Sequence, residues 1–278
     1  MRHRYSRGGG EATPWRHAAL APAGCAAKAS CMTEVQKILL LAGSFEARRV
    51  AEALTAGGVP YDAWLSEAPR GAAPMPQIPL LRRFECQAQM QEAIAQGGYT
   101  AVLDASHVFD RTVTQIGYAA ARALGLPYLR LERPAWETTD HPRWRSVASP
   151  ADANAMIPDG AQVFCATGWD SLPDFADFRG ARLLLRQTRR HARPAPYPHV
   201  ELVFGDPPFS VAQEKALFAR LGVDLLICRN IGGAASRPKL DAARALDLDV
   251  ILIERPPTPE GLAQVAEIDA AIAWVTAQ

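Results

Sequence analysis

The stretch ICRNIGGAASRPKLDAARALDLDVILIERP, residues 227–256, contains a strand, a glycine-bearing loop, a helix and a second strand that ends at Pro256. The short apolar runs at its two ends are typical of strands buried on both faces, as in parallel sheets. The loop lies where open α/β sheets bind ligands, between the carboxyl end of a strand and the amino end of a helix. Its cations and glycines predict an anionic ligand, with candidate residues Arg229, Asn230, Gly232, Gly233, Ser236, Arg237 and Lys239.

The same alternation of strands and helices runs through the chain from Lys37 onward. It predicts strands over 37–41, 59–65, 101–104, 127–131, 162–166, 182–186 and 199–204, and helices over 46–56, 86–95, 112–124, 211–221 and 259–277. This pattern favours parallel sheets built from βαβ units, divided by an irregular linker over 135–150. Each half ends in a similar tetrad, Leu131-Glu-Arg-Pro134 and Ile253-Glu-Arg-Pro256, which indicates either a duplicated architecture or chance.

Composition excludes several classes of function. The 278 residues carry a net charge of +1, from 30 basic and 29 acidic side chains, so no overall field draws the chain to nucleic acid or membranes. The five cysteines lack metal-ligand spacing, which favours reduced cytoplasmic thiols and argues against a structural metal. No apolar run approaches the ~20 residues that a membrane span needs.

Residues 1–32 differ in composition from the rest, being rich in Arg, Gly, Ala and Pro. We expect a disordered extension, or a start codon assigned too early with Met32 as the true start. The apolar stretch 18–25 is weak and broken by Pro22, unlike a secretory signal. A lipoprotein cleavage site at Gly24-Cys25 is a minor alternative.

Four further segments contain candidate site residues. Gly43 lies in the turn after the first predicted strand. This turn either binds a phosphate or is an ordinary connection between strand and helix, because the full dinucleotide fingerprint is absent. His107, in DASHVFD over 104–110, is a candidate acid or base, although a helix cap explains the segment equally well. Trp169 follows Thr167-Gly168, and we expect it either to stack on a flat ligand or to cover the core. The basic run over 185–193 is a solvated face or a polycarboxylate site.

Taken in order, these segments resemble the precorrin-6A reductases of corrin-ring biosynthesis, from about residue 38 to residue 256. The family's LGGTxEA is similar to LAGSFEA (41–47), its DATHPF to DASHVF (104–109), and its LRLERPxW to LRLERPAW (129–136). Its TTG is similar to ATG (166–168), and its GPF with a later glutamate to PPF (207–209) with Glu214. Its TKNSGG…KLxAA block is similar to CRNIGG (228–233) followed by KLDAA (239–243).

The resemblance implies an α/β fold of two Rossmann-like domains, over 33–134 and 146–278, with a ligand cleft between them. It implies NADPH as the hydride donor and a contracted tetrapyrrole as the substrate, reduced at a ring D carbon and protonated at the neighbouring carbon. His107 and Lys239 are then the catalytic candidates. NADPH is expected at Gly43, Ser44, Glu46, Arg82, Arg83 and Ser106. The substrate carboxylates are expected at Arg130, Arg133, Thr167, Arg186, Arg229, Asn230, Gly232, Gly233, Arg237 and Lys239.

The chain departs from the family pattern at several positions. The segment LRRFEC (81–86) replaces a glycine-rich stretch, and its Arg82 or Arg83 could bind the 2′-phosphate of NADPH. Arg229 replaces a lysine and cannot donate a proton, which leaves His107, Lys239 or water. We expect a cytoplasmic enzyme with transient contacts to neighbouring pathway enzymes. A nucleotide-sugar or phosphometabolite transferase and a non-catalytic two-lobed binding protein are the alternatives.

Overall fold

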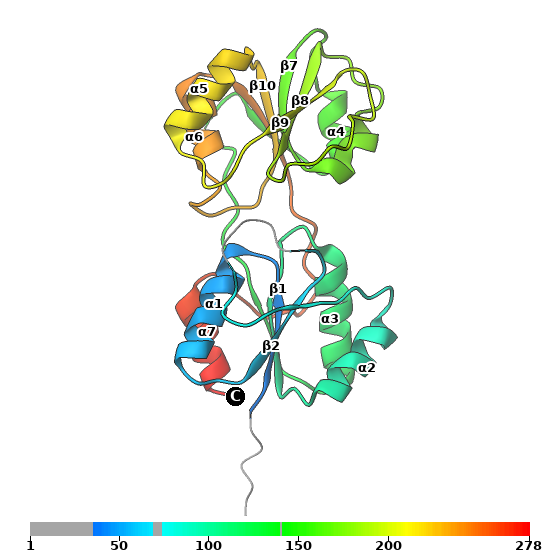
Figure 1. Ribbon diagram of the computed structural model, residues 1–278, viewed down its shortest axis with the longest axis vertical. Coiled ribbons are helices and arrows are strands. Elements are labelled where there is room, and N and C mark those ends of the chain that lie inside the picture. Colours follow the sequence, from blue (N-terminus) through cyan, green and yellow to red (C-terminus); the bar gives the residue numbers. More distant parts are fainter. Residues whose placement is uncertain (1–35, 69–73, 140) are drawn as a thin grey trace, which may run out of the picture. The chain divides into compact units, whose positions relative to one another are not determined.

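The computed structural model describes residues 36–68, 74–139 and 141–278 and arranges them in two six-stranded parallel sheets flanked by helices (Figure 1). Every strand pairing in both sheets is parallel, which confirms the predicted α/β class. The extension predicted over residues 1–32 lies outside the described residues.

The first sheet has the strand order β12-β5-β4-β1-β2-β3. Helices α1 and α7 cover one face of it, and α2 and α3 cover the other (Figure 1). Its elements are β1 (Ile38–Ala42), α1 (Phe45–Ala56), β2 (Tyr61–Leu65), β3 (Leu80–Leu81), α2 (Gln87–Gly97), β4 (Ala101–Ala105), α3 (Arg111–Ala123), β5 (Tyr128–Leu131), β12 (Gln264–Val265) and α7 (Ile268–Thr276).

The second sheet has the strand order β6-β11-β10-β7-β8-β9. Helices α5 and α6 pack together on one face, and α4 lies on the other (Figure 1). Its elements are β6 (Trp144–Val147), α4 (Pro150–Ala155), β7 (Gln162–Ala166), the 3₁₀ helix η1 (Trp169–Phe175), β8 (Arg182–Gln187), β9 (Val200–Phe204), α5 (Val211–Leu221), β10 (Leu225–Arg229), α6 (Pro238–Ala245) and β11 (Asp249–Ile253).

The two sheets share one topology. Numbered along the chain, β1 to β5 and β7 to β11 both lie in the order third, second, first, fourth, fifth, which is the order of dinucleotide-binding Rossmann folds. In both sheets a further strand lies beside the fifth. The tetrads that end in Pro134 and Pro256 follow equivalent strands, β5 and β11. This correspondence favours duplication over chance.

Burial on both faces explains why β1 is apolar throughout. In β1, Ile38 and Leu40 join one core with Ala271 and Val275 of α7, while Leu39 and Leu41 join the opposite core with Met90. All of β1 is buried. A strand between two helical layers has no solvent face, so the alternation of apolar and polar residues seen in half-exposed strands is absent.

Three expectations about the chain beyond residue 134 need correction. Strand β12 pairs with β5, and α7 packs on α1, so these C-terminal elements belong to the first sheet and not to the domain predicted over 146–278. The helix predicted over 259–277 begins only at Ile268, because Gly261 has a φ of 75° and β12 intervenes. The linker predicted over 135–150 contains β6, whose exposed Arg145 and Ser146 hide its strand character.

Candidate functional site

A pocket of about 350 Å³ lies at the carboxyl edge of the second sheet. Residues that follow β7, β8 and β10 line it, together with the start of α6. Strands β7 and β10 are neighbours whose connections leave in opposite directions, and such a switch point is where open α/β sheets bind ligands. Six predicted site residues line this pocket: His107, Thr167, Arg186, Arg229, Ser236 and Lys239.

Arg186 is one of the cations that line the pocket, and its side chain is only 8% exposed. Its Nη2 donates to Glu214 Oε2 at 2.6 Å, and its guanidinium lies 4.1 Å from the centroid of Phe209 and 4.9 Å from that of Phe164. Its Nε is buried and has no hydrogen-bond partner among the described residues. A buried donor without a partner is costly, so the burial of this N–H works against the stability of the fold.

Glu214, in the first turn of α5, was not among the predicted site residues. It is 4% exposed and lines the pocket. Burial raises the pKa of its carboxyl group, although the adjacent Arg186 acts in the opposite direction. The signal in the sequence was the glutamate that follows Phe209 in the family pattern, but no spacing rule connects it to Arg186, 28 residues earlier.

Lys239 lies in the first turn of α6. Its Nζ donates to the backbone oxygen of Ser236 at 2.6 Å and lies 5.3 Å from the centroid of the Trp136 ring. Burial lowers the pKa of this amine, and the nearby cation Arg186 adds to the effect, whereas Glu214 opposes it. An amine with a lowered pKa releases its proton more readily than an exposed lysine.

His107 and Arg229, which also line the pocket, come from equivalent strands, the fourth in the order that the two sheets share. His107 follows β4, and its Nδ1 accepts from the backbone N–H of Phe109 at 3.2 Å. Arg229 is the last residue of β10, and its guanidinium lies 5.2 Å from the centroid of the Phe109 ring. Thr167, after β7, is buried, and its hydroxyl contacts Ser171 Oγ at 2.5 Å. His107 and Arg229 therefore both contact Phe109 beside the pocket.

Asn230, Gly232 and Gly233, for which a substrate role was predicted, do not line the pocket and contact other parts of the chain, although Ile231 between them does line it. Both ends of the Asn230 amide bond the backbone of Trp136, each at 2.8 Å. A Cβ on Gly232 would lie 2.1 Å from the oxygen of Pro134, and one on Gly233 would lie 2.4 Å from Arg133 Cδ. The two glycines are needed because residues 133–136 pack directly on this loop.

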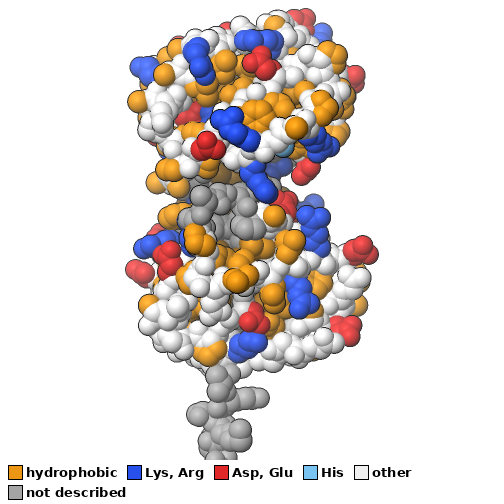
Figure 2. Space-filling model, viewed as in Figure 1, with side chains coloured by type: hydrophobic (Ala, Val, Ile, Leu, Met, Phe, Trp, Pro, Cys, Tyr) orange, Lys and Arg blue, Asp and Glu red, His pale blue; other side chains and the backbone are white. Residues whose placement is uncertain are grey.

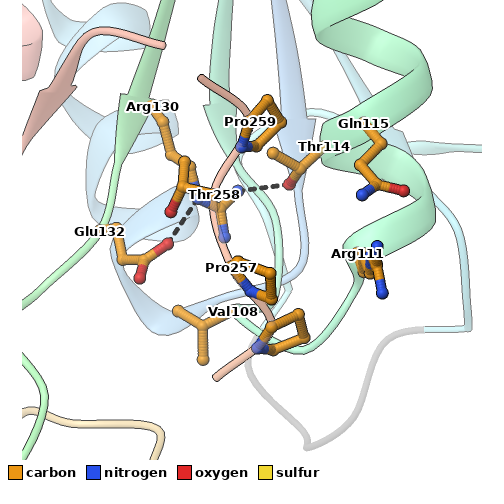
Figure 3. A pocket seen from close by; sticks show the side chains of 10 residues that line it. Val108, Arg111, Thr114, Gln115, Arg130, Glu132, Pro257, Thr258 and Pro259 are labelled. Atoms are coloured by element: carbon orange, nitrogen blue, oxygen red, sulfur yellow. Dashed lines mark hydrogen bonds and ion pairs between the residues drawn. The ribbon is translucent and has the colours of Figure 1, made fainter. Parts of the chain in front are cut away.

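Arg130, predicted to bind substrate, is instead enclosed in a network of the first sheet. It is 3% exposed, and its Nη1 donates to Asp104 Oδ2 and Thr114 Oγ1, each at 2.6 Å. Its Nε donates to Glu132 Oε2 at 2.5 Å. Figure 3 shows the segment Pro257–Pro259 passing beside Arg130. The hollow between them has a volume of only about 10 Å³. Although burial opposes ionisation, Arg130 holds the pKa of the Asp104 carboxyl below its usual value.

Two more predicted substrate cations bind carboxylates of the chain itself. Arg133 pairs with Glu46, and its Nε donates to the backbone oxygen of Ile231 at 2.8 Å. Arg237 pairs with Asp241 one turn along α6, at 3.2 Å. Neither lines the 350 Å³ pocket. Glu46, which was predicted to bind the cofactor, is therefore already paired with Arg133.

The two tetrads are joined to each other. Arg255 Nη1 of the second lies 2.8 Å from Glu132 Oε1 of the first and donates to the Arg133 backbone oxygen at 2.7 Å. Its Nε donates to the backbone oxygen of Asn230 at 2.9 Å. These contacts hold together the segment that leaves the first sheet and the one that returns to it.

The cofactor residues predicted for the first sheet lie at its carboxyl edge. Gly43 is exposed, but a Cβ there would lie 2.8 Å from the backbone nitrogen of His107, so the glycine is needed for this close approach. Ser44 caps α1, since its Oγ accepts from the Ala47 N–H at 3.1 Å. The Ser106 side chain is buried against Arg130. Arg82 and Arg83 follow β3, and both are exposed.

Other classes of site have little support on the described residues. No group of three or more His, Cys, Asp or Glu side chains among them could hold a metal ion. No helix in the described part of the chain is long and apolar enough to cross a membrane. On the face drawn in Figure 2, Lys and Arg side chains lie among acidic and apolar ones over both sheets.

Comparison with known proteins identifies the family. The family model described as Precorrin-6x reductase CbiJ/CobK matches residues 37–276. The Precorrin-6A reductase of Rhodococcus erythropolis is 34% identical over 244 residues, covering 86% of this chain and 97% of that protein. The protein of the same name from Rhodobacter capsulatus is 34% identical over 227 residues, covering 80% and 89%.

A solved structure agrees with this result. The structure titled CobK precorrin-6A reductase superposes with a TM-score of 0.79 at 30% identity, and the match covers 87% of this chain and 97% of that one. The match extends over both sheets, so it confirms the arrangement of two parallel α/β sheets as well as the sequence relationship. The chain belongs to the precorrin-6x reductase family.

Proposed function

We propose that this chain reduces precorrin-6A with NADPH in cobalamin biosynthesis, as a cytoplasmic enzyme. Hydride is transferred to a ring D carbon of the contracted tetrapyrrole, and a proton is added to the neighbouring carbon. The observation that carries the proposal is the 350 Å³ pocket, which Arg186, Arg229 and Lys239 line. Three cations that line one pocket suit a substrate with many acetate and propionate groups.

The carboxyl edge of the first sheet fits NADPH. The sheet has the strand order of dinucleotide-binding folds, and Ser44 caps the helix whose amino end would face the pyrophosphate. The exposed Arg82 and Arg83 follow β3, which pairs with β2, and an arginine near the end of the second strand selects NADPH by its 2′-phosphate. When bound, this cofactor supplies the hydride.

The residues of the pocket have three tasks in this proposal. Arg186 and Arg229 bind substrate carboxylates and so orient the ring. The aromatic rings of Phe164 and Phe209 exclude water from Arg186, which strengthens its hydrogen bonds. His107 and Lys239 are the candidate proton donors, and the lowered pKa of Lys239 favours release of its proton.

The test is stoichiometric oxidation of NADPH on addition of precorrin-6A, followed by mass analysis of the tetrapyrrole. The proposal predicts one NADPH consumed and a gain of two hydrogens per ring, and parallel assays with and without cobalt in the ring define the natural substrate. Absence of NADPH oxidation with either form would reject the reductase function. Transfer of a sugar or phosphoryl group to an acceptor would instead support the transferase alternative.

A further inference from the structure

We propose that the loop after β8, residues 188–193, forms a second carboxylate-binding surface beside the 350 Å³ pocket, where Arg190 and Arg193 bind peripheral carboxylates of the tetrapyrrole. We call this segment the arginine loop. The inference rests on the proposed function, because the ligand is taken to be a tetrapyrrole. It goes beyond that function, which places the substrate only at residues that line the pocket.

Aromatic rings hold the exposed cations of the arginine loop. The guanidinium of Arg193 lies 4.0 Å from the centroid of the Trp169 ring, and that of Arg190 lies 5.9 Å from the centroid of the Phe204 ring. His191 contacts both rings, at centroid distances of 5.3 Å and 5.4 Å. A ring positions a cation without neutralising it, so both guanidinium groups keep their charge and their in-plane N–H donors for a ligand.

The opposite end of β8 shows how exposed arginines are usually satisfied in this sheet. Arg182, the first residue of β8, lies 3.0 Å from a carboxylate oxygen of Glu201, and Arg179 lies 3.2 Å from one of Asp159. None of the three arginines of the arginine loop forms an ion pair within the part of the chain that the structure describes. Like charges that lie close together without a counter-ion repel one another, and a bound anion relieves this repulsion.

The arginine loop and the pocket lie at the same carboxyl edge of the second sheet. Thr188, the first residue of the loop, and Gly168, next to Trp169, both line the pocket. Trp169 packs on the core beneath η1, whereas Phe164 of the pocket belongs to the core beneath α5 and α6. The loop and the pocket therefore occupy two sides of one edge, and a ligand that lies across the edge can contact both.

The size of the pocket leaves part of a tetrapyrrole outside it. Small-molecule sites have volumes of roughly 300–1,000 Å³, and this pocket, at about 350 Å³, lies at the lower end of that range. A ring with many acetate and propionate groups would therefore extend beyond the pocket. Its outer carboxylates would meet the guanidinium groups of the arginine loop, whose planar donors suit bidentate binding of carboxylates.

The test compares two double variants of equal charge. Arg190→Gln/Arg193→Gln alters the arginine loop, and Arg179→Gln/Arg220→Gln removes two exposed arginines at the opposite, amino edge of the sheet. A third variant, Trp169→Leu, keeps every charge but removes the ring beside Arg193. The measurements are the Kd values for uroporphyrin, a tetrapyrrole octacarboxylate, and mesoporphyrin, a dicarboxylate, and the KM and kcat for precorrin-6A with NADPH.

We expect Arg190→Gln/Arg193→Gln to raise the Kd for uroporphyrin and the KM for precorrin-6A about fivefold or more, because hydrogen bonds to charged groups are lost. The Kd for mesoporphyrin should change less than about twofold, since its few carboxylates bind the pocket cations and distant sites act independently. The kcat should stay within about twofold, since the cofactor carries the chemistry. The amino-edge variant should change none of these values.

Trp169 is a positioning residue in this proposal. Trp169→Leu should raise the Kd for uroporphyrin by a smaller factor than the double variant and leave the Kd for mesoporphyrin unchanged. A general loosening of the fold would weaken binding of both porphyrins, so equal losses would reject this role of Trp169.

Two results would overturn the second surface. One is an unchanged Kd for uroporphyrin and KM for precorrin-6A in Arg190→Gln/Arg193→Gln, whose exposed positions leave the core intact. The other is an equal loss of uroporphyrin affinity in the two double variants, since net charge and not the loop would then decide binding. If uroporphyrin binding depends on the loop but precorrin-6A causes no oxidation of NADPH, the proposed function is rejected and the surface is supported.

Discussion

The two sheets have the same strand order but opposite arrangements of charge at their carboxyl edges. At the first sheet, Asp104 and Glu132 bind Arg130, and Glu132 also binds Arg255, so the buried charges satisfy one another. At the second sheet, the residues that line the pocket include three cations and one carboxylate, and the buried Nε of Arg186 has no partner among the described residues. Topology thus determines where an edge lies, whereas its side chains determine whether the edge stabilises the fold or binds a ligand.

The largest effect is expected at the first edge. Asp104→Ala would leave Arg130 buried without its main counter-ion, and removal of one partner from a buried pair costs roughly 3–5 kcal/mol of unfolding free energy. Chemical denaturation checks this value. The matched control is Glu52→Ala, which removes an exposed partner of Arg49 and should cost less than about 1 kcal/mol. Equal costs for the two variants would contradict the structural role of the Asp104–Arg130 network.

The next effect tests whether Gly232 is needed for packing. Gly232→Ala would place a Cβ 2.1 Å from the oxygen of Pro134, in a backbone with a φ of 69°. Gly58→Ala is the matched control, because Gly58 has a φ of 66° and a Cβ added there would meet no atom within 4 Å. The control should lose about 1 kcal/mol from backbone strain, and Gly232→Ala about 2 kcal/mol more, because an overpacked site adds its own cost. Thermal unfolding of the two variants separates the cost of backbone strain from the cost of overpacking. Equal losses of stability in the two variants would show that packing on residues 133–136 is unimportant.

The pH dependence of stability should differ in sign between the two edges. The pKa of Asp104 is lowered in the folded protein, so its contribution is present above the usual pKa and is lost as the pH falls below about 4. The pKa of Glu214 is raised, so its contribution is present at low pH and is lost as the pH rises above about 4.5. Each unit of difference between the pKa values in the folded and unfolded states corresponds to about 1.4 kcal/mol of unfolding free energy.

Urea unfolding from pH 3 to pH 7 measures this difference. The stability of the unaltered protein relative to Asp104→Asn should increase across the range, whereas its stability relative to Glu214→Gln should decrease. Parallel curves for both variants would show that the two edges do not differ in this respect.

The smallest effect on stability is expected at Lys239. Its pKa is lowered by burial, so the charged amine is held at a cost, and Lys239→Met should leave the free energy of unfolding unchanged or raise it by up to about 1 kcal/mol. The same variant should weaken binding of the tetrapyrrole. Denaturation and substrate titration check the two outcomes, and a destabilisation of about 2 kcal/mol or more would place Lys239 among the structural charges.

Much of the fold could be predicted from the sequence because the buried strands are short and uniformly apolar. The strand over 162–166 and the helix over 211–221 were predicted with their observed bounds. The pattern could not show which sheet a segment packs on, so the helix predicted over 259–277, which contains β12 and α7, was assigned to the second half. Their membership depends on packing of Ala271 and Val275 against the first core, a contact between residues far apart in the chain.

The site was predicted in part for a similar reason. His107, Thr167, Arg186, Arg229 and Lys239 were all predicted at strand or helix ends, and such ends meet at one edge of a parallel sheet. Residue type could not distinguish these from Arg130 and Asn230, which occupy comparable positions but bind the chain itself. That distinction depends on which partners are within reach after folding.

The central claim is that NADPH binds at the edge of the first sheet and the tetrapyrrole at that of the second. The most direct test is the separate KM values for NADPH and precorrin-6A in Arg83→Ala and Arg229→Ala. We predict that Arg83→Ala raises only the KM for NADPH and that Arg229→Ala raises only the KM for precorrin-6A, each about 10-fold, as expected for loss of a charged hydrogen bond. A reversed pattern, or one in which both variants alter the same KM, would contradict the assignment of the two ligands.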